Sequence, residues 1–289
     1  MLSLVSTDGY LWGVTEPSDT IGLIAGNRSL PLLFAQQARA QGVKRLVAAA
    51  FEGETDPRLA DLVDDIVWLK VGQLSKMISG LKQRGVRQCV MLGQISPRNL
   101  FELRPDLRAI SLLLKLKEKN AHSIFSAIAE ELNKEGIELI APVRWLQSLM
   151  PTAGFSLGPK LSDGQKQNVA FGFAIAKKIS ALEIGQTVVV KDGAVLAVEA
   201  FEGTDNCLRR GGALVGASGG GVAVKVAKEK HDLRFDVPCF GKQTIEVCHE
   251  AKISVFGFES AMTLLLDMET VASLAKKYRI TVAAVSCVV

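Results

Sequence analysis

Short apolar runs alternate with amphipathic stretches through the first half of the chain. The apolar runs have the length and the bounding glycines expected of buried strands. They cover residues 20–26, 45–51, 65–72, 88–96 and 137–142. Between them apolar residues recur every three or four positions, which predicts helices at 29–42, at 73–85 and at the end of 105–135. Strands that alternate with helices in this way predict a Rossmann-like parallel sheet with helices on both faces.

The second half repeats the alternation but begins differently. A helix predicted over 166–185 leads into two β-rich runs around Asp192-Gly193, a dipeptide typical of two-residue hairpin turns. Later runs predict strands at 219–228, 253–260 and 280–289, an extended segment at 231–241, and helices at 243–252 and 267–278. An antiparallel hairpin combined with strand–helix alternation predicts a mixed α/β sheet.

Length and composition favour two α/β domains. Domains usually hold about 100–200 residues, and this chain has 289. Two prolines and three glycines between residues 148 and 167 place a linker at 151–165. It would join a nucleotide- or substrate-binding domain at 20–150 to a catalytic domain at 166–289. Residues 1–19 lack the basic start of a secretory signal and are predicted to be an N-terminal extension.

Charge, cysteine use and hydropathy exclude several classes of function. The chain has 34 basic and 30 acidic residues, and a net charge of +4 is too small to indicate a nucleic-acid surface. Its five cysteines and three histidines show no zinc-binding spacing, so we interpret the cysteines as packing residues. No apolar run reaches the roughly 18–20 residues that cross a bilayer. We therefore expect a cytoplasmic protein.

Two loops that follow predicted strands in the first half are candidate ligand sites. In doubly wound sheets, ligands bind at the carboxyl ends of the strands. The loop AGNRSLP contains Gly26, Asn27 and Ser29, and its backbone N–H groups precede a helix, where they can bind phosphate. The loop GQISPRN begins at Gly93. Turn geometry alone explains Gly-Asn in the first loop equally well, and both explanations stay open.

Acidic residues gather at three predicted strand ends in the second half. The first group comprises Glu199, Glu202, Thr204 and Asp205. The second group comprises Glu259 and Thr263. The third, Asp232, Arg234 and Asp236, has the alternate spacing that puts side chains on one face of an extended chain. Converging carboxylates suit Mg²⁺, with Mn²⁺ as the alternative. A solvated face with a local salt bridge explains the third group equally well.

Three stretches resemble the LpxI family of UDP-2,3-diacylglucosamine pyrophosphatases in lipid A biosynthesis. They are IGLIAGNRSLP, VVVKDGAVLAVEAFEGTDNCLRR and HDLRFDVPCFG, and the resemblance extends in order over residues 20–286. It implies two α/β domains that hold the substrate between them. It also implies hydrolysis of the pyrophosphate bond with water and a divalent cation, which releases UMP and 2,3-diacylglucosamine 1-phosphate.

The resemblance implies roles for individual residues. The essential acid of the family's R-x-D-x-P segment corresponds to Asp236, which would be catalytic and would hold the cation together with Glu202 and Asp205. Arg209 and Lys225 would neutralise phosphoryl oxygens. With the candidates above, the substrate-binding set comprises Gly26, Asn27, Ser29, Gly93, Glu199, Gly203, Thr204, Arg209, Lys225, Arg234, Glu259 and Thr263.

Two family motifs differ in this chain. Asn27-Arg28-Ser29 occupies the place of a Gly-x-Gly, and Lys119-Asn120-Ala121-His122-Ser123 the place of Lys-x-Gly-Asp-Asp. Both differences affect the expected contacts with substrate in the first domain more than the hydrolytic chemistry.

The implied partner is an acylated UDP-sugar and not a nucleic acid, and the resemblance allows a peripheral contact with the inner membrane and a homodimer. Its acyl chains could contact Leu32, Phe34, Phe171 and Phe173, although core packing explains these residues as well. Two other classes stay open: a nucleotidyl- or glycosyltransferase on UDP-sugars, and a non-catalytic UDP-sugar-binding regulator. The need for an acceptor other than water distinguishes the transferase.

Overall fold

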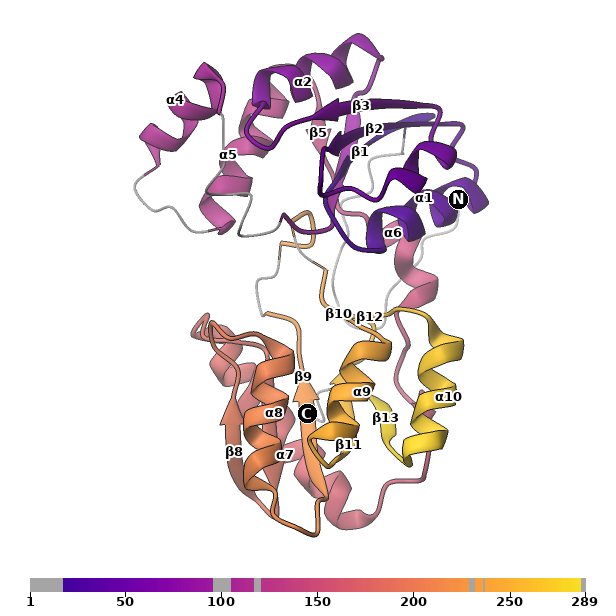
Figure 1. Ribbon diagram of the computed structural model, residues 1–289, viewed down its shortest axis with the longest axis vertical. Coiled ribbons are helices and arrows are strands. Elements are labelled where there is room, and N and C mark those ends of the chain that lie inside the picture. Colours follow the sequence, from indigo (N-terminus) through magenta and orange to yellow (C-terminus); the bar gives the residue numbers. More distant parts are fainter. Residues whose placement is uncertain (1–17, 96–104, 117–120, 229–231, 236, 287–289) are drawn as a thin grey trace. The chain divides into compact units, whose positions relative to one another are not determined.

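The computed structural model describes residues 18–95, 105–116, 121–228, 232–235 and 237–286, without the side chains of residues 121 and 122. The chain divides into two units, Met1–Ile140 and Ala141–Val289. Each unit has one main sheet (Figure 1). The predicted α/β class, with a parallel first sheet and a mixed second sheet, is confirmed. Residues 1–17 of the predicted N-terminal extension lie outside the described residues.

The first unit contains a five-stranded parallel sheet in the order β3-β2-β1-β4-β5. Its strands are β1 (Thr20–Ala25), β2 (Arg45–Phe51), β3 (Asp65–Leu69), β4 (Gln88–Leu92) and β5 (Glu138–Leu139). Its helices are α1 (Leu30–Ala40), η1 (Pro57–Asp61), α2 (Leu74–Gln83), α4 (Leu107–Lys115) and α5 (Ala121–Lys134). Most residues of β1 and β2 are buried, as expected of parallel strands covered on both faces.

The chain of this unit winds outward from β1 in both directions. Helix α1 leads from β1 to β2 on one side, and α2 leads from β3 back to β4 on the other. Because such crossovers are right-handed, α1 and α2 lie on opposite faces of the sheet (Figure 1). The strand order therefore reverses between β1 and β4, where ligands bind in folds of this kind.

The second unit contains a six-stranded mixed sheet in the order β6-β13-β11-β9-β7-β8 and a small parallel pair, β10 and β12. Its strands are β6 (Ser156–Leu157), β7 (Thr187–Lys191), β8 (Ala194–Val198), β9 (Gly221–Lys225), β10 (Cys239–Phe240), β11 (Ile253–Glu259), β12 (Leu264–Leu265) and β13 (Thr281–Val285). Its helices are α6 (Val143–Leu146), η2 (Gln147–Leu149), α7 (Asp163–Ala181), α8 (Thr204–Leu214), α9 (Lys242–Glu250) and α10 (Met268–Tyr278).

Helices cover both faces of the second sheet because its strand side chains alternate between two cores. Val188 and Val190 of β7 point to the core beneath α7, while Val189 points to the core that α8, α9 and α10 cover. Gly211 of α8 is buried against the second core, and an added Cβ there would lie 2.6 Å from the Cβ of Val189. Glycine therefore allows α8 to approach β7 closely.

Buried cysteines behave as packing residues within the described part of the chain. Cys89, Cys207 and Cys248 are buried and unbridged. Burial raises the pKa of the Cys89 thiol to about 12, so this thiol stays protonated at neutral pH.

Local sequence signals explain two boundaries in the second unit. Asp192 and Gly193 both have positive φ, 48° and 76°, which suits a type I′ turn, and the predicted antiparallel hairpin is confirmed. Helix α7 begins at Asp163 rather than at the predicted residue 166. The cause is a reciprocal capping box between Ser162 and Gln165, which satisfies backbone N–H groups at the helix start.

One predicted segment is wrong in part, because only its end forms a strand, β10. The charge spacing predicts an extended chain over 231–241, but residues 232–235 form a turn in which Phe235 N donates to Asp232 O at 3.0 Å. The Asp232 carboxylate also accepts a hydrogen bond from Arg234 N at 3.1 Å. Asp side chains commonly bond to backbone two residues ahead and so compete with strand formation. Asp232 and Arg234 therefore do not share the face of a strand.

Candidate functional site

The parallel strands of the second unit end at one side of the sheet, which we call the carboxyl edge. Strands β8, β9 and β11 reach this edge at Val198, Lys225 and Glu259, and β7 runs antiparallel and begins there. Polar side chains that follow these strands are therefore brought together although they are distant in sequence. Several predicted site residues lie at this edge.

A chain of hydrogen bonds joins three predicted residues at the carboxyl edge. The Nζ of Lys225 donates to Thr204 Oγ1 at 3.3 Å, and Thr204 Oγ1 donates to Glu199 Oε1 at 3.0 Å. Lys225 also donates to Cys239 O at 3.0 Å. An ammonium has three donors, and two of them are directed to these acceptors. Lys225 is thus held in place with donor capacity for a further acceptor.

A second charged cluster at the same edge contains a residue that sequence reasoning missed. Lys177 of α7 donates to Glu259 Oε1 at 3.0 Å and to Ala227 O at 3.3 Å. Glu259 Oε2 accepts from Ala227 N at 2.7 Å. The pair therefore fixes the backbone just after β9 in two places. Its sequence signal is weak: Lys177 interrupts an apolar helix, and its partner lies 82 residues away.

Residues at the start of α8 are committed to other partners. Gly203 occupies the N-cap position with a φ of 80°, which glycine adopts without strain. The Arg210 guanidinium hydrogen-bonded to Glu202 holds the pKa of that carboxyl below its usual value. Asp205 accepts from Gln243 Nε2 at 2.8 Å. Arg209 donates to Asn206 at 3.3 Å, and its Nε lies 3.8 Å from Glu250 Oε2 of α9.

The described residues show no ready-made metal centre. Within them no group of three His, Cys, Asp or Glu side chains could hold an ion. Of the predicted ligands, Glu202 is engaged by Arg210 and Asp205 by Gln243. Asp236, the third predicted ligand and the predicted catalytic acid, lies outside the described residues. Arg234 pairs with Asp232, with NH2 and Oδ2 at 2.6 Å, which is the local salt bridge of the alternative interpretation.

Thr263 carries an unsatisfied hydroxyl group. It lies between β11 and β12, is 0% exposed, and its Oγ1 has no hydrogen-bond partner. Buried polar side chains in native proteins almost always have a partner. A ligand that reaches this hydroxyl would supply one, which keeps Thr263 among the candidates for substrate binding.

The predicted loops of the first unit pair with each other. Gly26 N donates to Leu92 O at 2.8 Å and Asn27 N to Gln94 O at 2.7 Å. An added Cβ at Gly93 would lie 2.6 Å from Asn27 O, so glycine permits this contact. The Gly26 and Asn27 amides of the predicted phosphate loop are therefore used inside the protein. Ser29 occupies the N-cap position of α1 but its side chain makes no capping hydrogen bond.

A pocket opens beside this loop, at the carboxyl ends of β1, β2 and β3. It has a volume of about 560 Å³, within the range of about 300–1,000 Å³ that small-molecule sites span. It is lined by Arg28, Gly53, Glu54, Thr55, Asp56, Pro57 and Trp68. Glu54 accepts from Asn27 Nδ2 at 2.6 Å, which links the predicted Asn27 to the pocket wall. Trp68 and Arg28, an aromatic face and a cation, were not among the predicted residues.

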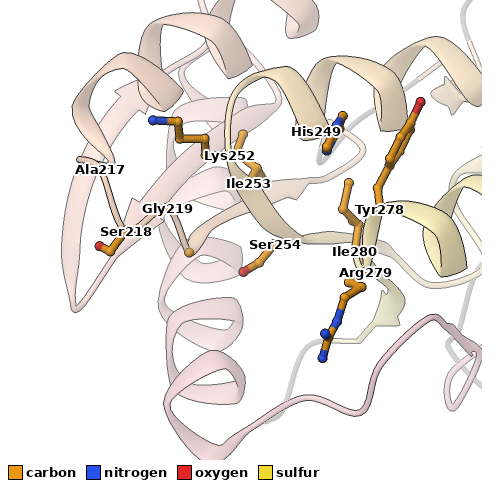
Figure 2. A pocket seen from close by; sticks show the side chains of 11 residues that line it. Ala217, Ser218, Gly219, His249, Lys252, Ile253, Ser254, Tyr278, Arg279 and Ile280 are labelled. Atoms are coloured by element: carbon orange, nitrogen blue, oxygen red, sulfur yellow. The ribbon is translucent and has the colours of Figure 1, made fainter.

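Another pocket, of about 250 Å³, lies at the amino-terminal ends of β9, β11 and β13 (Figure 2). His249 stacks on Tyr278 with ring centroids 3.9 Å apart. Lys252 and Arg279 follow the ends of α9 and α10, where helix dipoles favour basic side chains. Figure 2 shows these two side chains pointing in different directions. The cations therefore do not converge on one anion.

The proposed acyl-chain contacts are largely core residues. Phe34 is 0% and Phe173 5% exposed, and Phe171 packs against the core beneath α7. No helix in the described segments is long and apolar enough to cross a membrane.

Fold and site together define a two-domain α/β protein with charged side chains at the carboxyl edge of its second sheet. Family models match both parts: LpxI N-terminal domain over residues 20–149 and LpxI C-terminal domain over residues 152–283. A relative from Caulobacter vibrioides, named UDP-2,3-diacylglucosamine pyrophosphatase LpxI, is 30% identical over 266 residues, 88% of this chain and 93% of the relative. The chain belongs to the LpxI family. The predicted enzyme class, a hydrolase, agrees with the name of this relative.

Solved structures show only distant likeness. The biotin carboxylase domain of a thermophilic 2-oxoglutarate carboxylase bound to ADP has a TM-score of 0.26 and 16% identity, over 58% of this chain and 34% of that chain. A biotin carboxylase–β-γ-ATP complex from Campylobacter jejuni has a TM-score of 0.28 and 15% identity, over 68% of this chain and 42% of that chain. TM-scores this low do not establish a shared fold.

Proposed function

We propose that this protein hydrolyses the pyrophosphate bond of UDP-2,3-diacylglucosamine in lipid A biosynthesis. Water adds to one phosphorus, the P–O–P bridge breaks, and the products are UMP and 2,3-diacylglucosamine 1-phosphate. The observation that carries the proposal is the match to the Caulobacter relative over 93% of its length. Because both family models also match, the resemblance includes both units and not one shared domain alone.

Positive charge at the carboxyl edge supports binding of a pyrophosphate. Lys225, fixed by Thr204 and Cys239, can direct its remaining donor to a phosphoryl oxygen. Charge-assisted hydrogen bonds to phosphate are stronger than neutral ones, and groups that are already fixed stabilise charge without further reorganisation. Thr204 also begins α8, so the positive end of the helix dipole lies beside it. We propose that Lys225 and Thr204 bind and orient the phosphoryl groups.

The pocket beside Trp68 supports binding of the nucleoside part. An aromatic ring can stack on a pyrimidine base, and Arg28 can neutralise phosphate or contact the base edge. We propose that the uridine end of the substrate enters this pocket. Replacement of Trp68 by Ala should then raise KM more than it lowers kcat, because stacking on the base is equally present before and during the reaction.

The divalent cation stays part of the proposal. When bound, Mg²⁺ would withdraw charge from the phosphoryl oxygens. The described carboxylates Glu202 and Asp205 do not fit a ready-made site, because each already has a partner. We therefore assign no step to the cation and propose Asp236 as the catalytic acid on the strength of its place in the Arg-Phe-Asp-Val-Pro segment.

Purified protein incubated with UDP-2,3-diacylglucosamine and Mg²⁺ tests the function directly. We expect UMP, with oxygen from labelled water in one product. Asp236→Asn should reduce turnover about a hundredfold or more, while Asp163→Asn, an exposed control in the first turn of α7, should not. Release of UDP, or product formation only with an added acceptor, would instead favour a transferase. Wild-type turnover by Asp236→Asn would show that Asp236 is not a catalytic residue.

A further inference from the structure

Large aliphatic side chains cover the outer face of α4. Leu107, Ile110 and Leu114 are 86%, 40% and 77% exposed. Their spacing of three and four residues places them in one stripe along the helix. Ser111 and Lys115 are the other exposed residues of this helix, so most of its solvent face is apolar. Surface helices normally present polar residues to water, and a contiguous apolar stripe indicates an interaction surface.

The opposite face fixes α4 to the first unit. Asp106 caps the helix by accepting from Ala109 N at 2.9 Å, and it also accepts from Ser75 N at 2.7 Å, just inside α2. Arg108 bonds to Glu131 of α5 and to Glu135, the residue that follows this helix, with NH1 and Glu135 Oε1 at 3.0 Å. Ala109 and Leu112 are buried. The helix therefore has a well-anchored inner face, and its apolar outer stripe is not the result of a loose segment.

We propose that the α4 stripe binds a lipid bilayer, lying parallel to it at headgroup depth. Charge complementarity favours this occupant, because Lys115 is exposed at the end of the helix and the sequence continues LKEK, which adds two lysines and one glutamate. An apolar helix face together with lysines is the composition of helices that lie at anionic lipid surfaces. A stable protein–protein interface buries about 800 Å² of accessible surface on each partner. Three side chains of one short helix provide less than this.

Such binding would be weak and reversible, since it depends on one short helix. It would hold the protein at the surface where lipids with two acyl chains reside. The inference does not depend on the proposed hydrolysis, because vesicle binding can be measured without substrate.

Full-length protein sedimented with lipid vesicles provides the test. We expect binding to vesicles of phosphatidylcholine with about 30% phosphatidylglycerol, and weaker binding to phosphatidylcholine alone. The double variant Leu107→Gln/Leu114→Gln should lower the partition coefficient at least about tenfold. Leu182→Gln is the matched control, since Leu182 is 71% exposed but lies after α7 in the second unit. Lys115→Gln should lower the partition coefficient about fivefold on anionic vesicles and leave it unchanged on phosphatidylcholine alone.

Several outcomes would overturn the proposal. The first is wild-type protein that fails to sediment with either vesicle. The second is an equal loss of vesicle binding in the Leu182→Gln control, which would indicate non-specific lipid binding by exposed leucines. The third is a dimer of the wild type that the double variant converts to monomer, which would assign the stripe to a second copy of this chain. Because Leu107 is almost fully exposed, the single variant Leu107→Gln repeats the test if the double variant does not fold.

Discussion

Replacement of Thr263 by Val should make the protein more stable and less active. The hydroxyl is 0% exposed and has no hydrogen-bond partner. Leaving a buried polar group unsatisfied costs about 1–3 kcal/mol, and Val has nearly the same shape as Thr without that group. The free energy of unfolding should therefore rise by about 1–3 kcal/mol. For a unit of this size each kcal/mol raises Tm by roughly 2–4 °C.

Activity should change in the opposite direction if a substrate phosphate is the missing partner. A hydrogen bond to a charged group contributes about 1.5–3 kcal/mol, which corresponds to a loss of about tenfold to a hundredfold in kcat/KM. Thr281→Val is the matched control for stability. Thr281 is also buried, at 2% exposed, but its Oγ1 donates to Pro159 O at 2.8 Å, so this variant should be destabilised by about 0.5–1.5 kcal/mol.

Urea unfolding at neutral pH and steady-state release of UMP measure the two effects separately. If Thr263→Val loses as much stability as Thr281→Val, the hydroxyl has a partner inside the free protein and the reasoning fails. If Thr263→Val gains stability and keeps full kcat/KM, the hydroxyl is unsatisfied but does not contact substrate.

Three further predictions concern the pH dependence of stability, the packing of helix α8 and the metal requirement. The hydrogen bond from Arg210 lowers the pKa of Glu202, so this carboxylate contributes stability above its unfolded pKa of about 4.3, and that contribution is lost as pH falls through the lowered folded pKa. Urea unfolding should therefore show a smaller loss of stability below about pH 4.3 in Glu202→Gln than in the wild type. Gly211→Ala should destabilise the protein by about 1–3 kcal/mol through its clash with Val189, whereas Gly164→Ala, where an added Cβ meets nothing within 4 Å, should stabilise it by roughly 0.5–1 kcal/mol in thermal melts. Excess EDTA should stop UMP release and added Mg²⁺ should restore it; full turnover in chelator would contradict the metal requirement.

Most of the fold can be predicted from the sequence because local residue preferences agree with the burial and backbone geometry that the folded structure requires. The strand at 45–51 is apolar after Arg45, and its central residues are buried. The hairpin between β7 and β8 needs positive φ at both turn residues, and Asp192-Gly193 provides it. The prediction fails at 232–235, where the Asp232 carboxylate bonds to its own backbone. Charge spacing alone could not distinguish this turn from a strand, because charged residues at alternate positions are compatible with both structures.

The candidate site was harder to predict because its partners are distant in sequence. Glu199, Thr204 and Lys225 were predicted as separate residues, and the structure joins them by hydrogen bonds. Lys177 was missed because only the folded sheet brings it to Glu259. Glu202 and Asp205 stay predicted metal ligands, and the structure adds that Arg210 and Gln243 engage them.

The strand order of the second sheet also bears on how the protein is made. From one edge inward the strands are β8, β7, β9, β11 and β13, so after the first hairpin each strand joins the sheet in nearly the order of synthesis. β6 is the exception: it precedes all of them in the chain, yet Ser156 pairs with Ala283. On the ribosome the hairpin can form first from local contacts, and every later strand finds an open edge to extend. The earliest strand must wait until β13 has emerged, and only then can it pair with the free side of that strand.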